Sequence, residues 1–318
     1  FSDLKLIFLT YVNRSGSTFL ANLLDSSSDI LACPESDLLV TEFLEDPFKE
    51  FQMTDSEITD LSVRFEKDVK MKSWGISDVL YKNDYNGRTH FEVFISILEY
   101  YQSKIKPSAV WVLFKAERLI DLFPKINKRD FPGLQVIYIA IIRDGRGVYC
   151  SQKNSINPDT DLAFSRSITR TSFYWKRFAR KCVMMENMKN YHMIRFEDLL
   201  QDPLKSLEHL DPSLELKKFR IEPGKGDLMG RLPDTHKIIH SHINASPMLL
   251  KLSEWQTLLS RDEVCFLERV FGRELESFGY VRIWNRPCAF FVQIQYAVGW
   301  IAEKIRFIFR KVVFKIKH

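Results

Sequence analysis

Lys5–Thr10 reads KLIFLT, and the chain continues through Tyr11–Thr18 (YVNRSGST) into Phe19–Leu24 (FLANLL). The first stretch is a short apolar run, as in a buried strand. The second is polar and contains a glycine, which is typical of a loop. In the third, apolar residues recur at helical spacing. The sequence therefore predicts a strand, a loop and a helix in succession.

Further apolar runs predict more buried strands, with helical patterns between them; these runs are Ile30–Cys33, Ala109–Phe114, Val136–Ile142 and Tyr191–Phe196. Strands that are apolar throughout and alternate with helices indicate a parallel sheet covered on both faces. We therefore expect a three-layer α/β domain. Residues 45–105 are expected to be mostly helical, with a turn-rich break at 83–89. Residues 222–247 are rich in Gly, Pro and His and predict a long loop or lid.

Composition places the chain among globular proteins. It has 318 residues with 45% hydrophobic and 27% charged residues, and a formal net charge of +5. That length fits one large domain or two modest ones. The five cysteines are widely spaced and show no CxxC or zinc-ligand spacing, so we expect a reducing compartment and no disulfide framework. We expect neither a signal peptide nor a transmembrane helix, because no stretch reaches 18 uninterrupted apolar residues.

The loop after the first predicted strand has the composition of an anion-binding site. Ser15, Gly16, Ser17 and Thr18 can direct backbone N–H groups and hydroxyls at an anion, and the helix N-terminus adds the positive end of its dipole. The usual nucleotide loop is GxxxxGK[ST], and this chain lacks its first glycine and its Gly-Lys pair. A kinase or NTPase is correspondingly disfavoured. An ordinary helix N-cap remains the alternative.

A second candidate motif follows the run at Val136–Ile142. Arg143–Ser151 reads RDGRGVYCS, with an arginine at the strand end and a serine eight residues later. Arginine offers a fork of donors that matches phosphate, and serine adds a neutral donor. A second phosphate site is one interpretation, and a surface salt-bridge cluster is the other.

Together these two motifs resemble the sulfotransferase family. Asn13–Leu20 (NRSGSTFL) is similar to its 5′-phosphosulfate loop, and Arg143–Ser151 is similar to its 3′-phosphate motif RDPRxxxxS, with Gly145 in place of proline. Later segments also resemble the family: Arg195–Leu199 (RFEDL), Leu252–Trp255 (LSEW) and Phe278–Tyr280 (FGY). The resemblance spans about residues 4–282. It implies a P-loop-like sulfotransferase fold with a helical C-terminal extension.

The resemblance also implies a reaction and a set of contacts. The donor would be 3′-phosphoadenosine-5′-phosphosulfate (PAPS), and a sulfuryl group would pass in line to an acceptor hydroxyl without a metal. Arg14 would contact the bridging and 5′-phosphate oxygens, Ser15, Gly16, Ser17 and Thr18 would cradle the 5′-phosphate, and Arg143 and Ser151 would hold the 3′-phosphate. Lys237 and Arg231 would close over the 3′-phosphate from the predicted lid.

A base must take the acceptor's proton. Glu35 follows the apolar run Ile30–Cys33, so it is expected at a strand end beside the loop. Protein-tyrosine sulfotransferases and a related bacterial group carry a catalytic Glu at a similar place, whereas many cytosolic members use a His. Lys115 resembles a lysine that stabilises the leaving group in the tyrosine-modifying branch. A solvated loop carboxylate and a surface lysine are the alternatives, and His236, His240 or His242 is an alternative base.

The C-terminal tail has its own pattern. In residues 289–318, apolar side chains recur every 3.6 residues among six Lys/Arg and one acidic residue, so the tail carries +5 and residues 1–288 are neutral. A basic amphipathic helix with a tryptophan near its start is typical of an anchor on an anionic membrane surface. The alternative is a helix packed on the body or on a partner subunit. We therefore divide the chain into a sulfotransferase domain (1–285) and a basic amphipathic helix (286–318).

The acceptor is not named by any motif. A sugar or glycolipid is favoured, and tyrosine or a small alcohol is the alternative. Two other classes stay open: a P-loop kinase-like phosphotransferase and a catalytically idle nucleotide-binding membrane adaptor.

No nucleic-acid partner is expected. Sequons at Asn13 and Asn244 disfavour the Golgi lumen, since a glycan at Asn13 would lie beside the loop. A cytoplasmic bacterial enzyme, peripheral on the membrane, fits better.

Overall fold

The computed structural model describes residues 4–82, 85, 87–129, 131, 133–157, 160–165, 167–214, 221–239, 252–283 and 290–317. Its main sheet is parallel, with strand order β2-β3-β1-β4-β7. These strands are β1 (Lys5–Tyr11), β2 (Ile30–Ala32), β3 (Trp111–Lys115), β4 (Gln135–Ile142) and β7 (Tyr191–Arg195). A short antiparallel pair, β5 (Ile156–Asn157) and β6 (Leu162–Ala163), lies outside it. The predicted parallel sheet is confirmed.

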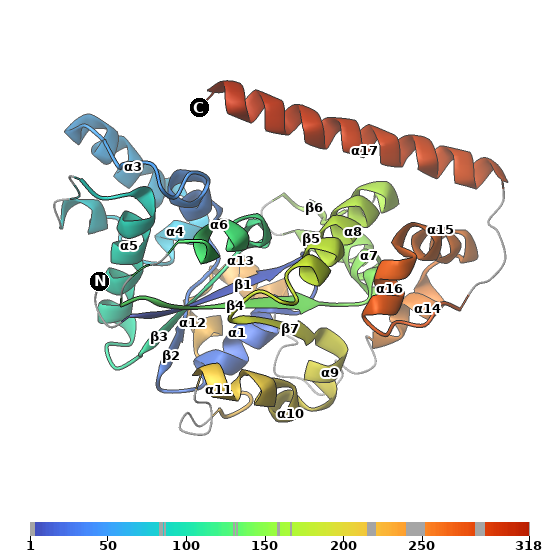
Figure 1. Cartoon of the computed structure of the whole chain (residues 1–318), viewed down its shortest axis with the longest axis horizontal. Coiled ribbons are helices and arrows are strands. Elements are labelled where there is room, and N and C mark those ends of the chain that lie inside the picture. The colour runs from blue at the N-terminus through green and yellow to red at the C-terminus, as the bar shows by residue number, and fades with distance from the viewer. Residues whose placement is uncertain are drawn as a thin grey trace.

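Helices cover both faces of this sheet (Figure 1). The helices on one side of the sheet are α2 (Asp37–Leu39), η1 (Val40–Leu44), α3 (Asp55–Lys67), α4 (Val69–Lys72), η2 (Val79–Tyr81), α5 (His90–Ile105), η3 (Glu117–Asp121), α6 (Phe123–Asn127), α7 (Gly145–Asn154) and α8 (Ile168–Met184). The other holds α1 (Ser17–Asp25), α9 (Phe196–Gln201), α10 (Pro203–Leu207), η4 (Glu208–Leu210), α11 (Asp211–Leu214) and α12 (Leu228–Arg231). The remaining helices are α13 (Asp234–Ile239), α14 (Glu254–Leu258), α15 (Arg261–Phe271), α16 (Arg273–Ser277) and α17 (Phe290–Lys317).

The apolar strands supply two separate cores. Along β1, Leu6 and Phe8 enter the core shared with α5 and α6, whereas Ile7 and Leu9 enter the core shared with α1 and α9. Successive side chains of a strand point to opposite faces, so a strand buried on both sides must be apolar at every position. This is why the run KLIFLT contains no polar residue between Leu6 and Leu9.

The strand order places the candidate site. β1 pairs with β3 on one side and β4 on the other, in register from Lys5 opposite Trp111 and Gln135. The connection that leaves β1 runs to β2 at one edge of the sheet, whereas the connection that leaves its neighbour β4 runs to β7 at the other edge. Ligands of open α/β sheets bind outside the carboxyl ends of strands at such a switch point. The loop after β1, Glu35 after β2, Lys115 at the end of β3 and Arg143 after β4 all lie at these carboxyl ends.

The helices bear on the predictions made for two longer segments, residues 45–105 and 222–247. The helical prediction for residues 45–105 is confirmed by α3, α4 and α5. The segment 222–247, predicted as a loop or lid, contains the short helices α12 and α13 in its described part. Its remainder, with His240 and His242, lies outside the described residues. Over the described part of the chain, no helix is both long enough and apolar enough to cross a membrane.

Candidate functional site

The loop after β1 depends on two left-handed residues. Arg14 has φ 74° and Gly16 has φ 86°. A Cβ on Gly16 would lie 2.2 Å from Cδ2 of Phe196, at the start of α9. Glycine is thus required at position 16 both by the backbone angle and by the close approach of Phe196. A non-glycine residue in this region is strained, and such strain is common at functional loops.

Two side chains from other elements hold this loop through Asn13. Glu117 of η3 accepts the backbone N–H of Asn13 on Oε1 at 2.8 Å. Gln152 of α7 donates from Nε2 to the carbonyl of Asn13 at 2.9 Å. Burial raises the pKa of the Glu117 carboxyl to about 7, although the Asn13 hydrogen bond opposes this shift.

The two predicted phosphate motifs meet at Arg14. Its Nε donates to Oγ of Ser151 at 3.2 Å, and Nη1 of Arg143 donates to the carbonyl of Arg14 at 2.9 Å. Burial and then the charge of Arg143 lower the pKa of Arg14 to about 10. Burial also lowers the pKa of Arg143. Two arginines that are desolvated in this way are suited to a multiply charged anion, which would balance their charge.

The second arginine of the RDGR motif has another role. Arg146 pairs with Asp144 at 2.6 Å and with the buried carboxylate of Glu268, and its guanidinium lies 3.9 Å from the ring centroid of Trp255. These contacts attach α7 to α14 and α15. A Cβ on Gly145 would lie 2.5 Å from Phe271, so the packing around this position excludes a larger residue. That explains why glycine occupies the position where the family pattern has proline.

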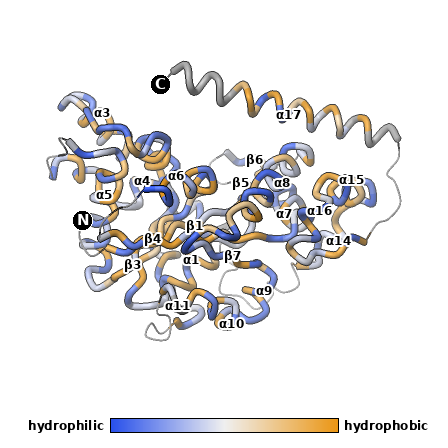
Figure 2. Tube along the Cα trace, viewed as in Figure 1, coloured by the Kyte–Doolittle hydropathy of each residue, from blue (hydrophilic) through white to orange (hydrophobic). Residues whose placement is uncertain are grey.

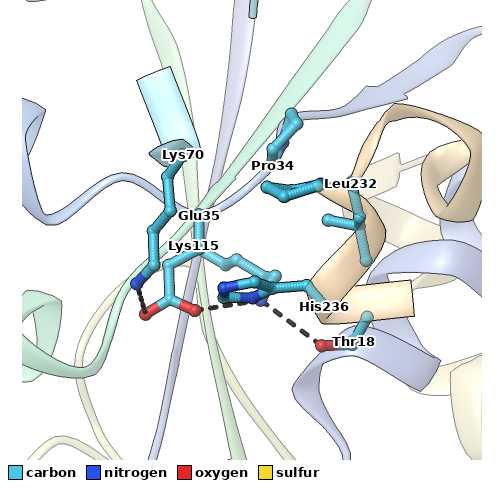
Figure 3. A pocket seen from close by; sticks show the side chains of 8 residues that line it. Thr18, Pro34, Glu35, Lys70, Lys115, Leu232 and His236 are labelled. Carbon is cyan, nitrogen blue, oxygen red and sulfur yellow. Dashed lines mark hydrogen bonds and ion pairs between the residues drawn. The ribbon is translucent and has the colours of Figure 1, made fainter. Parts of the chain in front are cut away.

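A pocket beside the loop brings Glu35 and Lys115 together. Lys115 Nζ lies 3.6 Å from Oε2 of Glu35 and donates to Oγ1 of Thr18 at 3.4 Å. On the other side, Lys70 Nζ of α4 lies 3.7 Å from Oε1 of Glu35 (Figure 3). The pocket is lined by Thr18, Pro34, Glu35, Lys70, Lys115, Leu232, Pro233 and His236. The predicted base and the predicted leaving-group lysine therefore face one space next to the phosphate loop.

The charges in this pocket keep Glu35 ionised. Burial alone would raise the pKa of its carboxyl. The charges of Lys115 and Lys70, a hydrogen bond from Tyr11 and, last, the charge of His236 outweigh burial and bring the pKa down to about 2. Lys115 has only 4% of its side chain exposed, and burial lowers its pKa even though Glu35 opposes the shift. A carboxylate that is ionised, with 23% of its side chain open to solvent, can accept a proton.

The predicted lid is attached to the body on the other side of this pocket. Arg231 of α12 pairs with the fully buried Asp25 at 2.6 Å and donates to the carbonyl of Ala32 at 3.1 Å. We expected Arg231 to close over a phosphate, and the structure instead uses it to anchor the lid. Lys237 of α13 pairs with the exposed Asp234 at 2.8 Å, and its contact with the 3′-phosphate stays a prediction. His236 of α13 points into the pocket toward Glu35 (Figure 3).

Sequence reasoning missed Lys70 and Glu117. Lys70 lies in the mostly helical segment 45–105, and no motif distinguishes it from the other lysines there. Glu117 follows Lys115 by two residues, so its position just past a strand end was a usable signal. Neither residue could be linked to its partner, because both contacts join distant parts of the chain.

Among the residues that the structure describes, no group of three or more His, Cys, Asp or Glu is placed to hold a metal ion.

A family model described as the sulfotransferase family matches residues 7–219 of the chain.

The chain belongs to the sulfotransferase family.

Two solved structures show the same fold as this sulfotransferase. The sulfotransferase domain from the curacin biosynthetic pathway superposes with a TM-score of 0.52 at 18% identity, covering 88% of this chain and 99% of that one. The sulfotransferase domain from the Synechococcus PCC 7002 olefin synthase gives a TM-score of 0.56 at 17% identity, covering 87% of this chain and 95% of that one. A comparison with curated proteins found no match.

Proposed function

We propose that this sulfotransferase moves a sulfuryl group from PAPS to an acceptor hydroxyl, with Glu35 as general base. The observation that carries the proposal is the pocket in which Glu35, Lys115 and Thr18 meet beside the phosphate loop. A base, a cation and an anion-binding loop at one sheet edge are what an in-line transfer needs.

Donor binding is proposed for the two motifs that meet at Arg14. The loop Ser15–Thr18, at the N-terminus of α1, would hold the 5′-phosphate, and Arg143 and Ser151 would hold the 3′-phosphate. Burial and the charge of Arg143 lower the pKa of Arg14, which supports this assignment, because a bound phosphate would offset that positive charge. Lys237 is proposed to join them only when donor is bound.

The transfer itself follows from the charges. The acceptor oxygen attacks sulfur, its proton goes to Glu35, and the bond between sulfur and the 5′-phosphate oxygen breaks with its electron pair on that oxygen. Lys115 and Arg14 would stabilise the charge that develops there. Lys115 pairs with Glu35 in the structure, so drawing Lys115 toward the leaving phosphate would weaken its hold on Glu35. The pKa of Glu35 would then rise, which makes it a stronger base.

For the acceptor, a sugar or glycolipid is favoured over tyrosine or a small alcohol. The pocket wall contributed by Leu232 and Pro233 is apolar, and Lys70 and His236 add polar groups able to bind hydroxyls or an acidic substituent. The cytoplasmic location stays a prediction.

Donor specificity is tested by thermal shift with the 3′-phosphorylated product PAP against ADP with magnesium. We expect PAP to raise the melting temperature and ADP with magnesium to leave it unchanged. Arg143→Met should lose the PAP response. Stabilisation by ADP with magnesium but not by PAP would favour a kinase-like phosphotransferase instead.

The base is tested by radiolabelled sulfate transfer across a panel of sugar, glycolipid, tyrosine and alcohol acceptors. Glu35→Gln should lower kcat by about 100-fold or more while its PAP response is kept. Asp37→Asn is the matched control, since Asp37 also pairs with Lys70 but is 71% exposed. Full activity in Glu35→Gln would disprove the assignment. Donor binding without transfer to any acceptor in the wild type would favour an idle adaptor.

A further inference from the structure

The long C-terminal helix α17 has two apolar faces. One face packs on the body: the ring of Trp300 lies 5.7 Å from Phe173 of α8, Phe307 lies 5.5 Å from the same ring, and Tyr296 lies 4.3 Å from Phe266 of α15. The helices approach closely, since a Cβ on Gly299 would lie 2.9 Å from Thr169. These contacts occupy the face that a helix needs in order to join a core.

The opposite face is exposed and apolar. It consists of Ile294, Val298, Ile301, Ile305, Ile308 and Phe309, which are between 47% and 67% exposed. Their spacing of three and four residues forms a continuous stripe along the helix, and we call this set the outer stripe. Hydrophobic residues recur along α17 in Figure 2. A contiguous row of large apolar side chains on the surface marks an interaction site more often than isolated ones do.

Positive charge flanks the outer stripe. On a period of 3.6 residues, Lys304 and Arg306 fall on the two opposite borders between the packed face and the stripe, and both are exposed. The same helix carries four more basic residues by sequence, and residues 289–318 hold the whole net charge of the chain. Glu303, the acidic residue of this segment, is buried at 9% exposure on the packed side, and its carboxylate pairs with Arg306 at 2.7 Å. The positive charge on that border is therefore partly balanced, whereas Lys304 supplies the other border.

The position of α17 leaves the outer stripe accessible. In Figure 1 the helix runs across the outside of the α8 layer, and no other element lies beyond it in that view. A flat surface could therefore contact the helix along its length.

We propose that the outer stripe of α17 binds the surface of an anionic lipid bilayer, with the helix lying in the plane of the interface. The apolar side chains would enter the boundary between headgroups and acyl chains, and the flanking cations would contact acidic headgroups. A second copy of the chain is the less suitable occupant, because two identical stripes would bring their basic borders face to face. The inference is independent of the proposed reaction.

The test is co-sedimentation of the full chain with vesicles of phosphatidylcholine alone or with about one-third phosphatidylglycerol. We expect the anionic vesicles to bind on the order of tenfold more protein, and added salt to reduce this excess. The double variant Ile301→Glu/Ile305→Glu should lose about tenfold or more of its partitioning into anionic vesicles.

The matched control is Leu204→Glu. Leu204 lies in α10 on the other side of the sheet and is 53% exposed, against 54% for Ile301. Its variant should bind vesicles like the wild type, and circular dichroism should confirm that all variants are folded. Equal binding to both vesicle types, or unchanged binding by the double variant, would overturn the proposal. So would a wild-type dimer that the double variant converts to a monomer without any vesicle binding.

Discussion

At the scale of single residues, the site contains two carboxyl groups, Glu35 and Glu117, whose pKa values are shifted in opposite directions. Lys115 and Lys70 hold Glu35 ionised, with a pKa of about 2, whereas burial raises the pKa of Glu117 to about 7. The difference follows from their neighbours. Glu35 lies between two ammonium groups, and Glu117 has a backbone N–H as its close partner. Glu35 is therefore held as a carboxylate, the form that the proposed base requires, whereas the carboxyl of Glu117 holds the loop.

The raised pKa of Glu117 predicts that this residue lowers the stability of the folded chain as the pH rises. Between about pH 4.5 and 7 the folded chain keeps a proton that the unfolded chain has lost, so this residue makes the free energy of unfolding fall as pH rises. Glu117→Gln removes the titration while its amide oxygen can still accept from Asn13. We expect the variant to be more stable than the wild type by about 1–3 kcal/mol at pH 8 and by much less at pH 5. Urea unfolding at both pH values measures this, and an equal difference at both would contradict the assigned pKa.

At the scale of elements, one buried ion pair attaches the lid segment 221–239 to the sheet. Asp25, at the end of α1, also accepts the backbone N–H groups of Ala32 and Asp227 at 2.8 and 2.9 Å. It thus joins α1, the end of β2 and the lid, with Arg231 supplying the balancing charge. Pro233 and His236 reach the pocket because α12 is held in this way.

Arg231→Met should therefore be strongly destabilising, since it leaves a fully buried carboxylate without its cation. We expect a loss of about 3–5 kcal/mol in the free energy of unfolding by urea. The control is Lys237→Met, which breaks an exposed pair on α13 and should cost at most about 1 kcal/mol. Similar losses in the two variants would show that Arg231 does not anchor the lid.

At the scale of the whole molecule, α17 packs outside α8, which belongs to one of the two helical layers that cover the sheet. Of the two alternatives raised by the tail sequence, packing on the body is confirmed for one face of α17, which contacts α8 and α15. The other face is exposed, and its contact with a bilayer stays a proposal. The packed face also carries a cation–π contact, with Arg177 at 4.7 Å from the ring centroid of Phe307.

Neighbouring residues of α17 should respond differently to truncation. Phe307→Ala removes ring contacts with Phe173 and Tyr174 and should lower the free energy of unfolding by about 1–3 kcal/mol. Ile308→Ala shortens a side chain that is 53% exposed. This variant should change the free energy of unfolding by at most about 0.5 kcal/mol. Thermal unfolding of both variants measures the difference. A larger effect at Ile308 would mean that the helix packs with the opposite face.

Much of the fold and part of the site follow from local sequence. Each strand is apolar at successive positions because both of its faces are buried, and the two phosphate motifs each follow such a strand, so their convergence at one sheet edge could be predicted. The same pattern places Glu35 and Lys115 at strand ends, and the resemblance to the family supplies the roles expected of them. The separation of charge, with the surplus confined to residues 289–318, is likewise a property of the sequence.

The partners of these residues depend on tertiary structure. Glu35 meets Lys115 because β2 lies beside β3 in the sheet, although 80 positions separate the two residues, and no local pattern encodes strand order. Lys70 reaches Glu35, and Arg231 reaches Asp25, through segments whose own periodicity shows only that they are helix or loop. The tail shows the same limit: its amphipathic pattern predicts a helix, but which apolar face packs and which remains exposed is set by the aromatic surface of α8 that receives it.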